Sequence, residues 1–302
     1  LGYYKYFDFF LRIVNRLTGS EHEMRNIPLP IGISFFTFGA ISYLMDLYRG
    51  HYEAEKNPLN MALYLSFFPK ISVGPIARYR DFAPQLVNRQ ETVEKTAEGI
   101  RRFAYGLGKK VLVANIVGAS VDKIYAQDIT NVTGVMVWCA AILYAIQIYY
   151  DFSGFTDMAI GLGKMFGFDI CENFNYPYLS GSIQEFWRRW HISLSSWLRD
   201  YIYIPLGGGR KGLAVRQRNI LLVFLISGLW HGGAPQFLAW GLLYGAGQVV
   251  QDFYKKAKQA VFGEAKIGLE KLRHMFSVLL TFFTVMCFWI FFRSESVSMA
   301  VI

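Results

Sequence analysis

The sequence of 302 residues contains little charge: Asp, Glu, Lys and Arg make up 18% of it, against about 25% in typical soluble domains. Ionisable acids and bases are absent from Val132–Tyr150, a run of 19 residues, and from Met275–Phe292, a run of 18. About 20 apolar residues are needed to cross the hydrocarbon core of a bilayer. Two such runs, with weaker companions, exclude an ordinary soluble protein and predict an integral membrane protein.

Sequence motifs for disulfides, metal binding, nucleotide binding and a serine nucleophile are also missing. The three cysteines are odd in number and show no CxxC spacing, so neither a disulfide framework nor a zinc site is indicated, and we expect no bound metal. There is no P-loop, Rossmann fingerprint or zincin motif. Ser153 lies between Asp151 and Asp157 but lacks the G-x-S-x-G elbow of a serine nucleophile. A catalytic role for Ser153 is therefore not expected.

The net charge of +9 comes from basic residues placed between apolar segments. This distribution is typical of loops held at a membrane face, so we expect the lipid bilayer, and not nucleic acid, as the partner. The densest basic stretch, Arg210–Arg218, contains no acidic residue. The excess of Lys and Arg in cytoplasmic loops places this stretch in the cytoplasm.

The remaining apolar segments predict an all-α, polytopic transmembrane bundle. They are Ile27–Tyr48, Leu59–Ile76, Phe103–Val121 and the Gly-rich Phe152–Ile170. Proline and glycine interrupt Leu59–Ile76, which we expect to enter the bilayer without crossing it as one straight helix. In Ile183–Ile204, aromatic residues recur at spacings of three and four while arginines fall elsewhere. That pattern favours an amphipathic helix lying in the membrane interface.

Two apolar stretches between Asn219 and Val250 are separated by His231-Gly-Gly-Ala-Pro-Gln. One unbroken helix over this segment would be about 46 Å long, more than a bilayer needs. The two glycines and the proline would in any case interrupt it. Because basic residues flank the segment on both sides, we expect two shorter helices that dip into the membrane from the same side. His231 then lies at their buried junction.

His231 is the strongest candidate for chemistry, because an ionisable residue deep in apolar sequence indicates function. The alternative is a neutral imidazole that hydrogen-bonds a neighbouring carbonyl. Imidazole accepts a proton near neutral pH and returns it, as a general base must. His191 is either a second proton-handling or substrate-orienting group that faces the same cavity as His231, or an interfacial residue without a chemical role. Arg188 and Arg189 could meet the phosphates of a coenzyme donor or anionic lipid headgroups.

Four motifs carry a specific resemblance. They are Asp151–Gly163 (DFSGFTDMAIGLG), Glu172–Tyr178 (ENFNYPY), Phe186–Gly208 (FWRRWHISLSSWLRDYIYIPLGG) and Ser227–Gly233 (SGLWHGG). Together they resemble the membrane-bound O-acyltransferase family, and within it the alginate O-acetyltransferase branch. The resemblance covers nearly the whole chain. It implies that residues 1–302 form a single transmembrane domain, incomplete at both ends.

The resemblance implies a ring of tilted and re-entrant helices around a central funnel, with His231 as the catalytic residue and His191 as the second histidine of this branch. It further implies that an acetyl group from a cytoplasmic thioester, such as acetyl-CoA, crosses the bacterial inner membrane to hydroxyls of an exopolysaccharide such as alginate. Periplasmic acetyltransferase proteins are the implied partners. The thioester would be a substrate, and no bound cofactor is expected.

Two other functions stay open at the level of sequence. A related branch passes D-alanine from a carrier protein toward teichoic acid and shares the Trp-His and Glu-Asn-Phe-Asn features. A transporter or channel, with His231, Asp157 and Lys164 along a permeation pathway, is the alternative from another class. No inverted repeat is evident between the two halves of the sequence, which disfavours a transporter.

Overall fold

The computed structural model describes residues 1–128, 131–262 and 270–301, with side chains described except over 255–262. Every regular element in these ranges is helical, which confirms the predicted all-α class. In chain order the elements are α1 (Gly2–Thr18), α2 (Ile33–Tyr48), α3 (Pro58–Ser66), α4 (Phe68–Ile71), α5 (Tyr79–Val87), α6 (Val93–Gly108), η1 (Lys109–Ala114), α7 (Asn115–Tyr125), α8 (Gly134–Met165), η3 (Pro177–Leu179), α9 (Ile183–Arg189), α10 (Ile192–Leu198), η4 (Arg199–Tyr203), α11 (Leu213–His231), α12 (Pro235–Phe262), α13 (Glu270–Arg293) and α14 (Val297–Val301).

Three of the described helices, α8, α11 and α13, are long and apolar enough to cross a membrane. Only 22–28% of their most apolar windows is buried inside the protein. On α13, for example, Leu279, Leu280 and Phe283 are exposed. Apolar surface of this extent needs a lipid environment, and the prediction of a membrane protein is confirmed.

Helix α8 runs without interruption through 32 residues, whereas the sequence predicted separate segments before and after Asp151. The helix continues because charged partners on the neighbouring α6–η1 pair meet its acidic side chains. Asp151 pairs with Lys110, and Asp157 lies 2.6 Å from Lys109 Nζ and 2.8 Å from Arg102 Nε. The acidic residues thus hold helices together and do not end α8.

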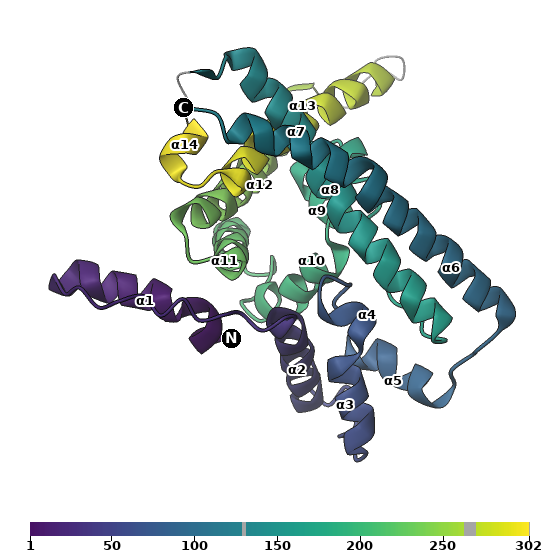
Figure 1. Cartoon of the computed structure of the whole chain (residues 1–302). Helices are drawn as coiled ribbons and strands as arrows, with labels where there is room; N and C mark the ends of the chain where they lie inside the picture. Colours follow the sequence, from purple (N-terminus) through teal and green to yellow (C-terminus); the bar gives the residue numbers. More distant parts are fainter. Residues whose placement is uncertain (129–130, 263–269, 302) are drawn as a thin grey trace.

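Glycines allow α6 and α8 to pack closely, as the Gly-rich composition of this segment predicted. A Cβ atom at Gly106 would lie 2.5 Å from the carbonyl oxygen of Gly154, and one at Gly99 would lie 2.6 Å from that of Gly161. The paired positions run in opposite order along the two helices, so α6 and α8 are antiparallel and lie side by side (Figure 1).

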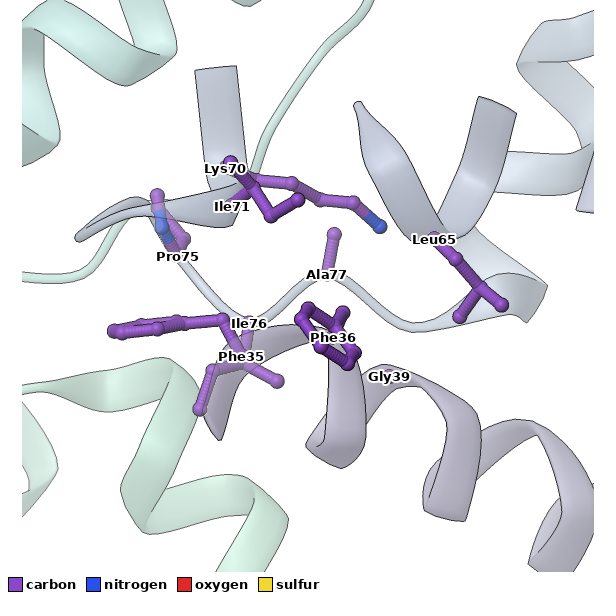
Figure 2. A pocket seen from close by; sticks show the side chains of 9 residues that line it. All are labelled: Phe35, Phe36, Gly39, Leu65, Lys70, Ile71, Pro75, Ile76 and Ala77. Carbon is purple, nitrogen blue, oxygen red and sulfur yellow. The ribbon is translucent and has the colours of Figure 1, made fainter. Parts of the chain in front are cut away.

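The segment predicted to be interrupted does divide, into α3 and the single turn α4. Lys70 of α4 is buried, with its Nζ 3.7 Å from the ring centroid of Tyr64, an arrangement that stabilises the ammonium on an aromatic face. Figure 2 shows this side chain extending over Ala77 beside the start of α2. Gly32, at a φ of +76°, leaves no room for a side chain against the Ile71 carbonyl. These contacts fix α4 against α2.

Residues Ile183–Ile204 do not form the predicted single amphipathic helix. The helix divides at Trp190–His191 into α9 and α10. Phe186, Trp190 and Leu194 are 0%, 3% and 1% exposed because they pack against other helices of the protein. The aromatic periodicity correctly identified an apolar face, but such a pattern does not distinguish burial in protein from burial at a lipid interface.

Helices α11 and α12 form the predicted hairpin, with its turn at His231–Pro235. A Cβ atom at Gly228 would meet the Phe237 carbonyl oxygen at 2.3 Å, and one at Gly241 would meet that of Phe224 at the same distance. The helices are therefore antiparallel, and their outer ends lie on one side, as expected. Helix α11 is longer than predicted, however: it has 19 residues and is long and apolar enough to cross a membrane by itself. Figure 1 shows α8, α10, α11 and α12 disposed around the centre of the molecule.

Candidate active site

The two candidate histidines line the same cavity at the centre of the helices, with a volume of about 280 Å³. His191 reaches it from the break between α9 and α10, and His231 from the end of α11. Most of the wall is aromatic, and its other lining residues are Phe35, Val73, Ile148, Asp151, Phe152, Phe155, Trp187, Trp190, Trp230, Trp240, Trp289 and Phe292. The structure thus brings together two histidines that the sequence placed in separate segments.

His231 is the last residue of α11, since the backbone becomes extended at Gly232. Its imidazole is half-buried and makes edge-to-face contacts with Trp230, Trp240 and Phe292 at centroid distances of 4.6, 5.0 and 5.0 Å. Within the described part of the chain, no side chain hydrogen-bonds this ring. The ring therefore lines the cavity without a side-chain hydrogen bond from those residues that would compete with a reactant.

His191 is held very differently. Its φ of 44° lies in the left-handed region, which is uncommon for residues other than glycine and costs on the order of 1–3 kcal/mol. Asn173, which is fully buried, stabilises this turn: its backbone carbonyl accepts a hydrogen bond of 2.9 Å from the Ile192 amide. His191 itself is only 2% exposed. A strained backbone braced in this way is a feature of functional sites.

The same asparagine determines the tautomer of His191. Asn173 Oδ1 accepts from the Ser193 amide at 3.1 Å and from the Ser193 hydroxyl at 2.9 Å, and it lies 3.1 Å from His191 Nδ1. Because a backbone amide can only donate, the shared atom must be the amide oxygen, so Nδ1 of His191 carries the hydrogen. Burial lowers the pKa of His191 to about 3, so the ring is neutral at physiological pH. Nε2, which has no partner among the described residues, is then a hydrogen-bond acceptor.

The structure gives different positions to Arg188 and Arg189, for which the sequence predicted the same role. Arg188 is exposed and lines a second cavity of about 290 Å³, together with Arg199 and Arg216. Arg189 does not line it and instead pairs with Glu185 at 2.7 Å. Trp187 lines both the second cavity and the central one, so a single indole lies between them.

Sequence reasoning missed Asn173, Ser227 and the cavity position of Asp151. Ser227 is 1% exposed, lies one turn before His231, and carries a hydroxyl without a partner among the described side chains. Its helical spacing from His231 is a signal that could have identified it. Asn173 carries no such signal, because it meets His191 only through the turn between them. Across the described ranges, no three His, Cys, Asp or Glu side chains lie close enough together to hold a metal ion.

Comparison with known families agrees with this geometry. Residues 51–266 match the model of MBOAT, the membrane-bound O-acyltransferase family. The match covers more than half of the chain and includes both histidines. The chain therefore belongs to the membrane-bound O-acyltransferase family.

Individual relatives extend the likeness over nearly the whole chain. The chain is 42% identical over 307 residues to a protein of Pseudomonas syringae pv. tomato named "Probable alginate O-acetylase AlgI", covering 99% of this chain and 56% of that protein. It is 37% identical to the peptidoglycan O-acetyltransferase of Helicobacter pylori, over 99% of this chain and 60% of that protein. It is 31% identical to the teichoic acid D-alanyltransferase of Bacillus subtilis, over 78% and 62%. The chain thus spans little more than half the length of the acetylase.

Proposed function

We propose that the protein transfers an acetyl group from a cytoplasmic thioester, acetyl-CoA, to hydroxyls of an exopolysaccharide such as alginate, directly or through periplasmic acetyltransferase partners. The protein would be a multi-pass protein of the bacterial inner membrane. The observation that carries the proposal is the placement of His191 and His231 on one aromatic cavity that adjoins a second, arginine-lined cavity.

The chemistry required is modest, because a thioester is an activated carbonyl. The acceptor hydroxyl attacks the carbonyl carbon, its proton passes to His231, and the C–S bond breaks as the thiolate leaves and takes up a proton. The half-buried His231 ring lines this cavity without a competing side-chain hydrogen bond from the described residues. His191, with Nε2 as an acceptor, would orient the acceptor hydroxyl. The mostly aromatic wall offers few hydrogen-bonding groups to water, which would limit hydrolysis of the thioester.

The charges around the second cavity suit an anionic donor. Arg188, Arg199 and Arg216 line it, whereas Asp252 lies 3.0 Å from Arg216, and Asp200 is shared between Arg199 and Arg78. The three arginines of the lining thus outnumber these two carboxylates, and Asp200 is also paired with the buried Arg78, which leaves positive charge for the phosphates of a coenzyme. Arg216 belongs to the basic stretch that the charge pattern predicts to be cytoplasmic. A donor bound here would approach the central cavity past Trp187.

The relatives favour acetyl over D-alanyl transfer. The chain is more similar to the two acetyl-transferring relatives, at 42% and 37% identity, than to the D-alanyltransferase, at 31%. D-alanyl transfer toward teichoic acid is the second candidate. Membership of an acyltransferase family disfavours the hypothesis of a transporter or channel.

The test uses the full-length protein in inverted inner-membrane vesicles supplied with acetyl-CoA labelled in the acetyl group. We expect label in the polysaccharide with the parent protein and with His274→Ala, a variant at an exposed histidine outside the cavity. We expect none above background with His231→Ala at equal membrane abundance. Parent-level labelling by His231→Ala would overturn the assignment of His231. Labelling only from a D-alanyl carrier protein would support the second candidate.

A further inference from the structure

Helix α1 contacts the segment that follows it, through Asp8 and Asn15, and also the end of α11, beside His231. Its residues are all at least partly exposed, and its far end projects away from the other helices (Figure 1). Near its N-terminus, however, the Lys5 ammonium donates a hydrogen bond to the Trp230 carbonyl, and the Tyr6 hydroxyl donates to the Leu229 carbonyl at 3.0 Å. Two neighbouring side chains of α1 thus bind the two carbonyls that directly precede His231.

A third contact lies on the other side of the histidine. The Phe9 ring packs on Gly233 so closely that a Cβ atom there would lie 2.8 Å from Phe9 Cδ2. Lys5 Nζ also lies 5.1 Å from the centroid of the Trp230 ring, on which the His231 imidazole packs. Lys5, Tyr6 and Phe9 therefore contact the backbone both before and after His231.

The end of α11 needs such partners. The last carbonyls of a helix have no amide donor within the helix, and here the backbone leaves the helical path at Gly232. A cation at a helix C-terminus is also stabilised by the helix dipole. Lys5 supplies a charged donor and Tyr6 a neutral one, so α1 adds two hydrogen bonds to the last turn of α11, beside its packing against α12.

We propose that Lys5 and Tyr6 are positioning residues that fix the last turn of α11 and thereby the orientation of the His231 imidazole. This inference rests on the proposed function. Within the described residues no side-chain hydrogen bond orients the His231 ring, which packs edge-to-face on three aromatic rings, so its direction depends strongly on the backbone that carries it. Groups that orient a metal ligand through a hydrogen bond typically contribute 10–100-fold to affinity or activity, and we expect an effect of about that size here.

The experiment measures kcat and KM for acetyl-CoA in vesicles that contain the full-length protein, with the rate expressed per mole of protein in the membrane. We expect Lys5→Met to lower kcat by about 10–100-fold with KM within about twofold, because the donor cavity is untouched. Lys5→Arg, which keeps a charged donor, should recover most of the rate. Tyr6→Phe should lower kcat less than Lys5→Met. Arg12→Met, at an exposed position on the same helix, should behave like the parent.

Three results would overturn the positioning role of Lys5. Parent-level kcat in Lys5→Met overturns it, as does an equal loss in Arg12→Met, which would indicate a general requirement for α1. A loss of membrane protein without a change in rate per mole also overturns it, because Lys5 would then serve stability alone. Failure of the proposed function is distinguishable, since the parent protein itself would then transfer no acetyl group.

Discussion

The two histidines of the central cavity are held in place in opposite ways. His231 ends a membrane-length helix, is half-buried, and is surrounded by aromatic edges without a hydrogen bond among the described residues. His191 lies in a strained break between two short helices, is almost fully buried, and is locked through Nδ1 by Asn173. A general base must be reachable by the group whose proton it accepts, whereas a group that orients a substrate needs a ring locked by hydrogen bonds of its own. The difference supports a proton-transfer role for His231 and an orienting role for His191.

The largest effect should come from the accessible histidine. His231→Ala should lower kcat by at least about 10³-fold, within the range general acid–base groups contribute. His191→Ala should cost less, because an orienting hydrogen bond is lost while the base remains. Initial rates of acetyl transfer at saturating donor, with protein abundance measured by immunoblot, check the order. A greater loss in His191→Ala would reverse the roles assigned to the two residues.

The locked histidine provides the next test. Asn173→Ala removes the acceptor for His191 Nδ1–H and for the Ser193 amide, so we expect a loss of about 10–100-fold in kcat. Leaving these donors unpaired should also destabilise the fold by about 1–3 kcal/mol. Asn173→Asp keeps the oxygen and should retain more activity than Asn173→Ala. Equal losses in the two variants would show that the retained oxygen does not carry the effect.

The two adjacent arginines give the smallest expected effect and test the donor cavity. Arg188→Ala should raise KM for acetyl-CoA by about tenfold, as expected for one charge-assisted hydrogen bond, with little change in kcat. Arg189→Ala removes a partner of Glu185 outside the cavity and should leave KM within about twofold of the parent. Titration of the donor in vesicles measures both constants. Equal KM values for the two variants would remove Arg188 from the donor site.

Much of the fold follows from the sequence, and the exceptions have physical causes. Long uncharged runs identified α8 and α13, and the His-Gly-Gly-Ala-Pro interruption identified the α11–α12 turn. The continuity of α8 through Asp151 was not predictable, because it depends on lysine and arginine partners from another helix. The break at His191 was missed because helical periodicity continues across it, and its partners Asn173 and Asn175 come from a segment that precedes α9.

The candidate site, like the fold, was predicted from the sequence only in part. His231 and His191 were identifiable as residue types in an apolar setting, and a helical register links Ser227 to His231. No local pattern indicated that His191 and His231 share a cavity, nor that Arg188 and Arg189 diverge. Those relations arise from the packing of α9 and α10 against α11.

The most direct test of a single site that uses both histidines is a double-variant comparison. Acetyl transfer is measured for His191→Ala, His231→Ala and the combined variant, each in the full-length protein at equal membrane abundance. Residues that act as a unit in one step are strongly non-additive, so the combined variant should lose no more than about twofold beyond His231→Ala. A combined loss equal to the product of the two single losses would contradict the account, because it would mean that the histidines act independently.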